Sequence, residues 1–358
     1  MGTGQCRPTW RALHDGVMHL LAAPDNFGTW GTARQVASAI ARGARQAGWT
    51  AAEVPLSDGG EGFCEVIGGR RRSSLVGGPL GARVQAEWRL VADSKPVAAV
   101  LEVAKASGLA LAGGREFNRA LDATTAGTGE LIMAAVATGA KRVIVGCGGS
   151  ASTDGGWGAV QAIAPRGRLA GVELVAAVDV QTRFEDAARV FAAAKGASGP
   201  EIALLSARLR RLRQLYRDDF GIDVGEIAGS GAGGGLAGGL VSLGAKVIPG
   251  FEVAAAMCGL AEKIAAADLV ITAEAHLDEE SFQGRVVGGV VSMAKELGTP
   301  VVAVVAEADQ GEWSEGLEVL TVPHEFGSGP HEFGSGSSGR HLDELERIVA
   351  ARLESPGV

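Results

Sequence analysis

The chain has 358 residues, enough for about two domains with a sizeable core in each. Its net charge of −8 argues against a nucleic-acid partner and against binding to an anionic membrane surface. Four scattered cysteines without a CxxC pair argue against a disulfide framework and a zinc site, which favours the cytoplasm. No stretch is apolar over the length needed to span a bilayer, so no membrane partner is expected.

The first half of the chain begins with alternating strands and helices. Residues 1–17 lack the apolar core of a signal peptide and are predicted to be a disordered leader, with Met1 and Met18 both open as the start. A predicted strand over 19–23 is followed by a loop that carries Asp25 and Asn26, and then by a helix over 33–47. A second strand over 51–56 runs into the loop 57–62. Binding crevices of open α/β sheets lie at such carboxyl ends of strands.

The alternation of strands and helices stops after Gly68, where a domain boundary is expected. Residues 75–76, 84–91 and 97–103 read as strands with no long helix between them. This pattern predicts an antiparallel or mixed portion of sheet.

The stretch 143–158, VIVGCGGSASTDGGWG, predicts a strand, a glycine-rich loop and the start of a helix. Bare glycine backbone and a helix N-terminus together can receive a phosphate group. The alternative is a tight turn that needs glycine only for its dihedral angles. The acid Asp154 and the three hydroxyl side chains of the loop favour a binding site, because a simple turn requires none of them.

The second half continues the alternation of strands and helices. A strand over 172–178 ends at Asp179, and residues 229–240 form a second glycine-rich turn that enters a helix. The arginines of the amphipathic helix over 200–216 are predicted to form a solvated face. A buried strand over 268–272 precedes Glu274 and Asp278.

The last predicted elements are a strand over 299–305 and a helix over 342–353. Between them HEFGSG occurs twice, and residues 324–339 are predicted to be a flexible linker. A metal site at His324 and His331 is the less favoured interpretation, because no third ligand is placed.

Several of these motifs together resemble the bacterial glycerate kinases, which make 2-phosphoglycerate from D-glycerate and ATP. APDNF at 23–27, SDGGEG at 57–62, GTGEL at 127–131 and GCGGSASTDGG at 146–156 occur in that family's order. KGA at 195–197, GSGAGGGLAGGL at 229–240 and DLVITAEAHLD at 268–278 are similar to it as well. The resemblance covers residues 18–306.

The resemblance implies an α/β fold of two domains with the active site in the cleft between them. One would be a parallel, Rossmann-like three-layer domain, and the other a mixed-sheet domain inserted into it. We expect residues 18–68, 120–165 and 258–358 in the first domain, and residues 69–119 and 166–257 in the inserted one. The expected substrate is glycerate or a similar small hydroxy acid, with ATP and Mg²⁺ as cofactors, and a homodimer is left open.

The expected site is rich in carboxylates, glycines and cationic groups. Asp58, Asp154, Asp179 and Lys195 are the predicted catalytic residues, and Asp154 and Asp179 are also the predicted metal ligands. The residues expected to bind substrate or nucleotide are Asp25, Asn26, Gly59, Gly60, Glu61, Gly148, Gly149, Ser150, Gly233, Gly234, Glu274, Asp278 and Arg285. For each single carboxylate, capping of the following helix is an equal alternative.

The sequence departs from the family pattern at several of these positions. Phe27 is followed by Gly28-Thr29-Trp30, without the family's lysine, and alanines flank Glu274 where the family has glycines. Arg285 stands where the family has a lysine. The second hypothesis is therefore a catalytically weakened or inactive homologue that binds a small ligand or a protein partner.

Overall fold

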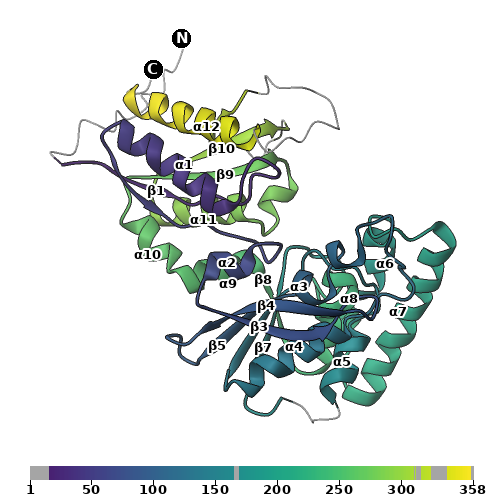
Figure 1. Cartoon of the computed structure of the whole chain (residues 1–358). Coiled ribbons are helices and arrows are strands. Elements are labelled where there is room, and N and C mark those ends of the chain that lie inside the picture. The colour runs from purple at the N-terminus through teal and green to yellow at the C-terminus, as the bar shows by residue number, and fades with distance from the viewer. Residues whose placement is uncertain (1–15, 165–168, 310, 312–315, 324–336, 356–358) are drawn as a thin grey trace. The chain divides into compact units, whose positions relative to one another are not determined.

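The structure is a computed structural model that describes residues 16–164, 169–309, 311, 316–323 and 337–355. It divides into two compact units (Figure 1). The first comprises Met1–Leu56 and Ala255–Val358, and the second is Ser57–Ala254. Because each unit has its own sheet and its own core, we describe them separately.

The first unit contains a five-stranded sheet in the order β11-β10-β9-β1-β2, in which every neighbouring pair is parallel. Its elements are β1 (His19–Ala22), α1 (Ala33–Gln46), β2 (Thr50–Glu53), α10 (Leu260–Ala265), β9 (Leu269–Leu277), η6 (Glu280–Phe282), α11 (Val286–Leu297), β10 (Val301–Ala308), β11 (Glu318–Thr321) and α12 (Ser337–Glu354). The helix α9 (Gly250–Cys258) crosses the division between the units.

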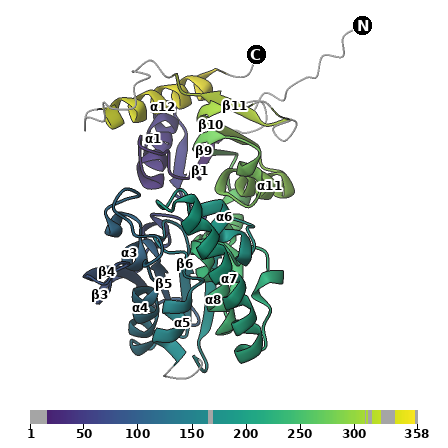
Figure 2. The ribbon, with the colours of Figure 1, turned by 90° about the vertical axis from the view of Figure 1, so that its right-hand side faces the viewer.

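Helices cover both faces of this sheet, as expected for a buried parallel sheet. Along β10, Val302 and Val304 pack into the core that α1 and α12 share, whereas Ala303 and Val305 pack against α11. Figure 2 shows α1 and α12 on one side of β1, β9 and β10, with α11 on the other. The alternation of side chains along one strand therefore supplies both cores of a three-layer unit.

The second unit contains a six-stranded mixed sheet in the order β3-β4-β5-β6-β7-β8. Its elements are α2 (Phe63–Ile67), β3 (Arg70–Gly77), β4 (Arg83–Val91), β5 (Ala98–Glu102), α3 (Ala104–Ser107), η2 (Ala110–Ala112), α4 (Ala126–Ala137), β6 (Arg142–Gly146), α5 (Trp157–Ile163), β7 (Glu173–Val178), η4 (Phe184–Asp186), α6 (Ala187–Phe191), α7 (Gly199–Phe220), η5 (Val224–Glu226), α8 (Ala232–Ser242) and β8 (Lys246–Pro249).

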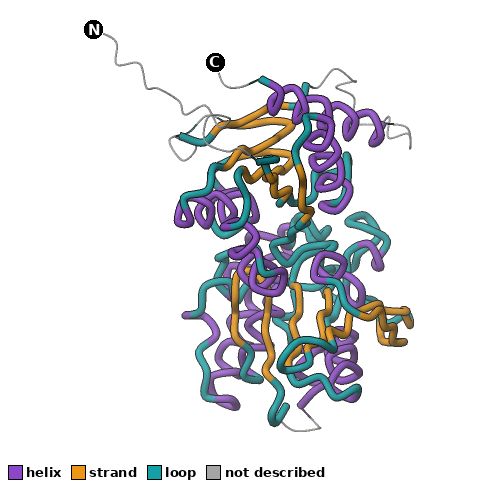
Figure 3. Tube along the Cα trace, turned by 90° about the vertical axis from the view of Figure 1, so that its left-hand side faces the viewer, coloured by secondary structure: helices purple, strands orange, loops and turns teal. Residues whose placement is uncertain are grey.

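The three strands β3, β4 and β5 pair antiparallel, and β5 to β8 pair parallel. In Figure 3 the strands of this sheet run between helices. The main core joins the sheet to four helices through Leu131 of α4, Val160 of α5, Leu205 of α7 and Leu236 of α8. The parallel strands β6 and β7 have their carboxyl ends on the same side of the sheet, and the glycine-rich loop 147–156 follows β6 there.

The predicted fold class is confirmed: one sheet is parallel, the other is mixed, and both lie in α/β units. The predicted division placed residues 120–165 with the first unit, whereas β6 pairs with β5 and β7 inside the six-stranded sheet. Strands buried on both faces look alike in either sheet, so composition does not say which sheet such a strand joins.

The C-terminal helix is longer than the sequence predicts. Helix α12 begins at Ser337, five residues before the predicted start, and thus includes the end of the predicted linker 324–339. Residues 1–15 of the predicted leader, and the HEFGSG segments with His324 and His331, lie outside the described residues. Among the helices that the structure describes, none combines the length and the apolar character that crossing a bilayer requires.

Candidate functional site

A small pocket lies where β6 and β7 end in the second unit. Its volume is about 230 Å³. The pocket is lined by Leu109, Cys147, Gly148, Gly149, Ser150, Asp179, Val180, Phe191, Ala194, Lys195, Ala232, Gly233 and Gly234. The structure thus brings seven of the predicted site residues together around one cavity: Gly148, Gly149, Ser150, Asp179, Lys195, Gly233 and Gly234.

The loop 57–62 packs on the glycine-rich loop that follows β6. The amide of Gly148 donates to the carbonyl of Gly59 at 3.3 Å, and a Cβ on Gly148 would lie 2.7 Å from the Cα of Gly60. The carboxylate of Asp58 accepts from the amide of Gly60 at 3.3 Å, which closes this loop on itself. The side chain of Glu61, exposed to solvent, approaches the backbone at Gly149. Two motifs 90 residues apart in the chain therefore meet at the rim of the pocket.

Lys195 is the buried cation of the pocket, with only 8% of its surface exposed. Its ammonium group donates to Ser150 Oγ and to the carbonyl oxygen of Ser152, both at 2.7 Å. Burial lowers the pKa of Lys195 to about 8, although the charges of Asp154 and Asp179 act in the opposite direction. A lysine fixed in this way can place a positive charge against an anionic ligand.

Asn118 positions the loop that carries Lys195. Its amide nitrogen donates to the carbonyl of Lys195 at 2.8 Å and to that of Ala151 at 3.0 Å, so one side chain holds the two loops together. Sequence reasoning did not select Asn118 or Ser152. Asn118 lies in a hydroxyl-rich stretch, residues 118–128, and Ser152 is one of the three hydroxyl residues of the glycine-rich loop, but neither pattern singles out one side chain.

Asp179 directly follows β7 and is half-buried at the pocket wall. Cys147 lies on the same wall and is fully buried. Burial raises the pKa of the Cys147 thiol, and the negative charge of Asp179 raises it further. Cys147 therefore stays protonated and unreactive, while Asp179 presents a carboxylate to the cavity.

Asp154, by contrast, does not line this pocket, and its carboxylate accepts several hydrogen bonds. Its carboxylate accepts from Thr124 Oγ1, from the amide and the hydroxyl of Thr125, and from the amides of Gly156 and Gly158, at 2.8–3.3 Å. Two of these amides lie at the start of α5, so the carboxylate ties α5 to the start of α4. This is the helix-capping alternative that the sequence left open for each acid.

The predicted metal ligands are Asp154 and Asp179. Across the described residues, no group of three or more His, Cys, Asp or Glu side chains is arranged to hold a metal ion. Both oxygens of Asp154 accept from chain donors, and Asp179 lines the pocket. Because Mg²⁺ in kinases is held by one or two carboxylates together with substrate phosphates, the lack of a larger cluster among the described residues leaves Asp154 and Asp179 as predicted ligands.

Gly234 shapes the pocket from the other side. Its φ of +69° is left-handed, and a Cβ there would lie 2.0 Å from the carbonyl oxygen of Ser152. That oxygen is an acceptor of the Lys195 ammonium group. Gly233 lines the same wall with a φ of +64°, so the regular part of α8 begins only after these glycines.

Gly234→Ala is expected to lower the free energy of unfolding by about 2–5 kcal/mol, because it adds overpacking to the strain of a left-handed residue. Gly244→Ala is the matched control, since Gly244 has a φ of +97° but nothing within 4 Å of its Cβ position. Urea denaturation should show a loss of only about 1–2 kcal/mol for the control. Equal losses in the two variants would show that the approach to Ser152 is unimportant.

The other five predicted site residues lie in the first unit, where β1 and β9 run side by side. The amide of Asp25 donates to the carbonyl of Ala273, and Asn26 Oδ1 accepts from the amide of Ala33, the first residue of α1. Glu274, 8% exposed, lies on β9 beside these loops. The APDN and TAEA segments are therefore neighbours near the carboxyl ends of β1 and β9.

Asp278 and Arg285 follow β9 in the same unit. Asp278 accepts from the amide of Ser281 at 2.9 Å, which stabilises the turn before η6. Arg285 precedes α11 and donates to Glu280 at 2.8 Å. Arg285 thus carries its charge on the loop after β9, partly neutralised by a surface carboxylate.

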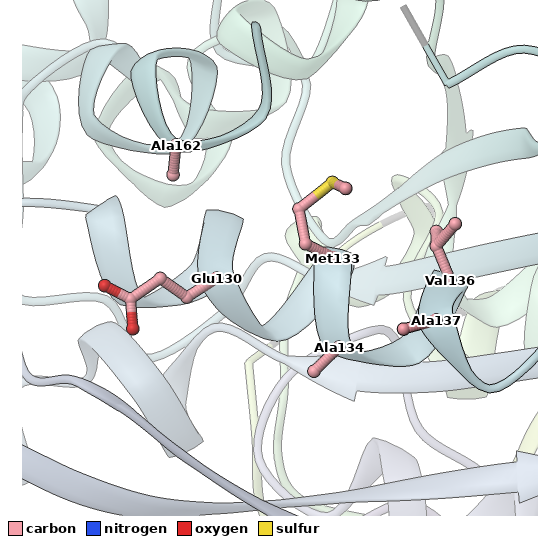
Figure 4. A pocket seen from close by; sticks show the side chains of 6 residues that line it. All are labelled: Glu130, Met133, Ala134, Val136, Ala137 and Ala162. Carbon is pink, nitrogen blue, oxygen red and sulfur yellow. The ribbon is translucent and has the colours of Figure 1, made fainter. Parts of the chain in front are cut away.

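A larger cavity of about 720 Å³ lies between α4 and α5. Figure 4 shows Glu130, Met133, Ala134, Val136 and Ala137 on one helix and Ala162 on another. Glu130 is its one charged group, and that carboxylate already accepts from the amide of Gly77 and from Arg83. The lining of this cavity therefore holds none of the predicted site residues, whereas the pocket around Lys195 holds seven of them and is the candidate site.

Comparisons with known proteins support the resemblance to the glycerate kinases. A family profile described as the glycerate kinase family matches residues 20–167 and 164–322. The chain is similar to the glycerate kinase of Halalkalibacterium halodurans, with 35% identity over 330 residues, 82% of this chain and 86% of that protein. It is 34% identical to the glycerate 2-kinase of Escherichia coli over 325 residues, 80% of this chain and 84% of that protein.

A solved structure is similar along nearly the whole chain. The crystal structure of putative glycerate kinase 2 from Salmonella typhimurium LT2 matches with a TM-score of 0.77 and 30% identity. The match covers 94% of this chain and 97% of that one.

Proposed function

This chain belongs to the glycerate kinase family, and we propose that it transfers the γ-phosphoryl group of ATP to the 2-hydroxyl of D-glycerate. The buried ammonium group of Lys195 in the pocket wall is the observation that carries the proposal. The chain is a kinase-type phosphotransferase with an alcohol as acceptor. ATP as donor and the 2-phosphate as product belong to the proposal.

The pocket suits a small acceptor. Its volume of about 230 Å³ is below the range of about 300–1,000 Å³ that drug-sized ligands occupy. Glycine backbone at Gly148 and Gly149 leaves room for an anion to approach main-chain amides, and Lys195 supplies a full positive charge. A three-carbon hydroxy acid matches both the size and the charge of this cavity.

Phosphoryl transfer depends mostly on positioning and on neutralisation of charge. In the proposed step the acceptor oxygen bonds to the γ-phosphorus, and the bond from that phosphorus to the ADP leaving oxygen breaks. Asp179 takes the hydroxyl proton, while Lys195 offsets negative charge on the transferring group. Mg²⁺, when bound with ATP, would neutralise phosphate oxygens, with Asp179 as a proposed protein ligand.

The remaining predicted site residues have supporting roles in this proposal. Asp58, Gly59, Gly60 and Glu61 support the rim of the pocket through the loop contacts described above. Asp154 positions α4 and α5, and so acts through its neighbours. In the first unit we assign nucleotide contacts to Asp25, Asn26, Glu274, Asp278 and Arg285, with Arg285 as the cation that faces phosphate.

The pH dependence of kcat/KM tests the role of Lys195. Because burial lowers the pKa of Lys195 to about 8 and the protonated form is the one required, kcat/KM should fall as pH rises through about 8. An ordinary lysine would lose its proton about two pH units higher. A rise of kcat/KM through the same range would assign Lys195 to proton abstraction instead.

The product identifies the acceptor hydroxyl. Full-length protein is incubated with MgATP and D-glycerate, and the product is examined by phosphorus NMR, in which a 2-phosphate and a 3-phosphate couple to different numbers of protons. The proposal predicts 2-phosphoglycerate together with an equal amount of ADP. A 3-phosphate product would contradict the assigned position, and ADP formation independent of glycerate would contradict the assigned acceptor.

A further inference from the structure

A third cavity of the same unit lies between α5, α7 and the loop 121–124. Its volume of about 440 Å³ falls within the range of ligand sites, and it shares no lining residue with the pocket around Lys195. Nothing in the proposed phosphoryl transfer uses it.

One wall of this cavity is apolar. The partly exposed indole of Trp157 lines it together with Leu212 and Leu215 of α7. Trp157 also packs against Tyr216, with 6.3 Å between the ring centroids, and the buried Tyr216 hydroxyl donates to the carbonyl of Gly155. The indole is therefore backed by a rigid neighbour, and aromatic rings stack well on such a surface.

The cationic wall comes from one side of α7. Two of that helix's arginines, Arg213 and Arg217, form ion pairs with Asp223, and Arg213 also pairs with Glu185 and Glu226. The two that line the cavity, Arg208 and Arg211, form no ion pair among the residues that the structure describes.

Arg208 and Arg211 differ in what they have left to offer a ligand. Arg208 donates to the carbonyl of Leu121 at 3.0 Å, which ties α7 to the opposite wall. Arg211 makes no such contact among the described residues and leaves its guanidinium available to the cavity. An unpaired cation at a cavity of an acidic protein is a ready partner for an anion.

The charges around the cavity favour a single negative charge on the ligand. Asp122 and Asp154 also line it, so a dianion such as a phosphate would meet two carboxylates. The planar fork of Arg211 matches the planar geometry of a carboxylate. We propose that this cavity, which we name the Trp157 cavity, binds an aromatic ring that carries one carboxylate.

Indole-3-acetate is the probe, and binding to the full chain is measured by isothermal titration calorimetry. We expect saturable binding of one molecule per chain, and at least tenfold weaker binding of indole, which lacks the carboxylate, and of acetate, which lacks the ring. Arg211→Glu should weaken binding at least tenfold. Arg210→Glu, the matched control, changes the neighbouring exposed arginine that does not line the cavity and should leave affinity unchanged.

Other outcomes would overturn the proposal. Absence of saturable binding, an unchanged affinity in Arg211→Glu, or equal losses in Arg210→Glu and Arg211→Glu would each do so. Displacement of the probe by D-glycerate would place it in the pocket around Lys195 instead. Since the readout is binding and not turnover, the result is independent of the proposed kinase activity.

Discussion

Replacing Lys195 with methionine is expected to lower kcat/KM for D-glycerate by about a thousandfold, the scale of a lost cationic group in phosphoryl transfer. Methionine keeps an unbranched side chain of similar length but cannot donate to Ser150 and Ser152 or neutralise charge. Steady-state assay of glycerate-dependent ADP release measures the effect.

The control for this variant is Lys141→Met, which removes an exposed lysine of the same unit. Its kcat/KM should remain within about twofold of the parent value, because an isolated surface charge contributes little. Far-UV circular dichroism on both variants checks that each is folded. A folded Lys195→Met variant with kcat/KM within tenfold of the parent would contradict the role given to this lysine.

Replacing Asp154 with asparagine is expected to lower the free energy of unfolding by about 2–4 kcal/mol, measured by urea denaturation. The asparagine has one oxygen for five donors, and its NH₂ group would face the amides and hydroxyls that the carboxylate now accepts from. The effect is on stability because the carboxylate connects α4 with the start of α5.

Asp122→Asn is the matched control, since Asp122 lies on a nearby loop, is exposed, and within the described part of the chain has the exposed Arg119 as its one ion-pair partner. It should change the free energy of unfolding by less than about 0.5 kcal/mol. If Asp154→Asn keeps the stability of the parent and yet abolishes turnover, Asp154 acts on the substrate or a metal and not as a helix cap.

The sequence predicted the architecture because hydrophobic pattern and motif order determine it. The apolar strand over 143–145 and the glycines that follow it lie in β6 and its loop, as the pattern indicates. The pairing of β6 with β5 and β7 could not be read in the same way. A strand buried on both faces carries no mark of its sheet, and long-range pairing leaves no local pattern.

The site was partly predictable for a similar reason. Lys195 and Asp179 follow recognisable loop motifs, and the structure brings them to one pocket. Asn118 was not predicted, because its role depends on two carbonyls, those of Ala151 and Lys195, that meet only in the folded chain. The capping role of Asp154 likewise depends on Thr124 and Thr125, which lie about 30 residues earlier.

The departures from the family pattern make activity itself the central question. Gly28-Thr29-Trp30 lacks the family's lysine, while Lys195 and Asp179 remain in their pocket. The most direct measurement is ADP release by the purified full chain with MgATP, in the presence and absence of D-glycerate. The retained pocket predicts glycerate-dependent release, with one ADP formed for each glycerate consumed. No release above the glycerate-free rate, at saturating ATP and glycerate, would contradict the kinase assignment and favour a binding protein that has kept the fold.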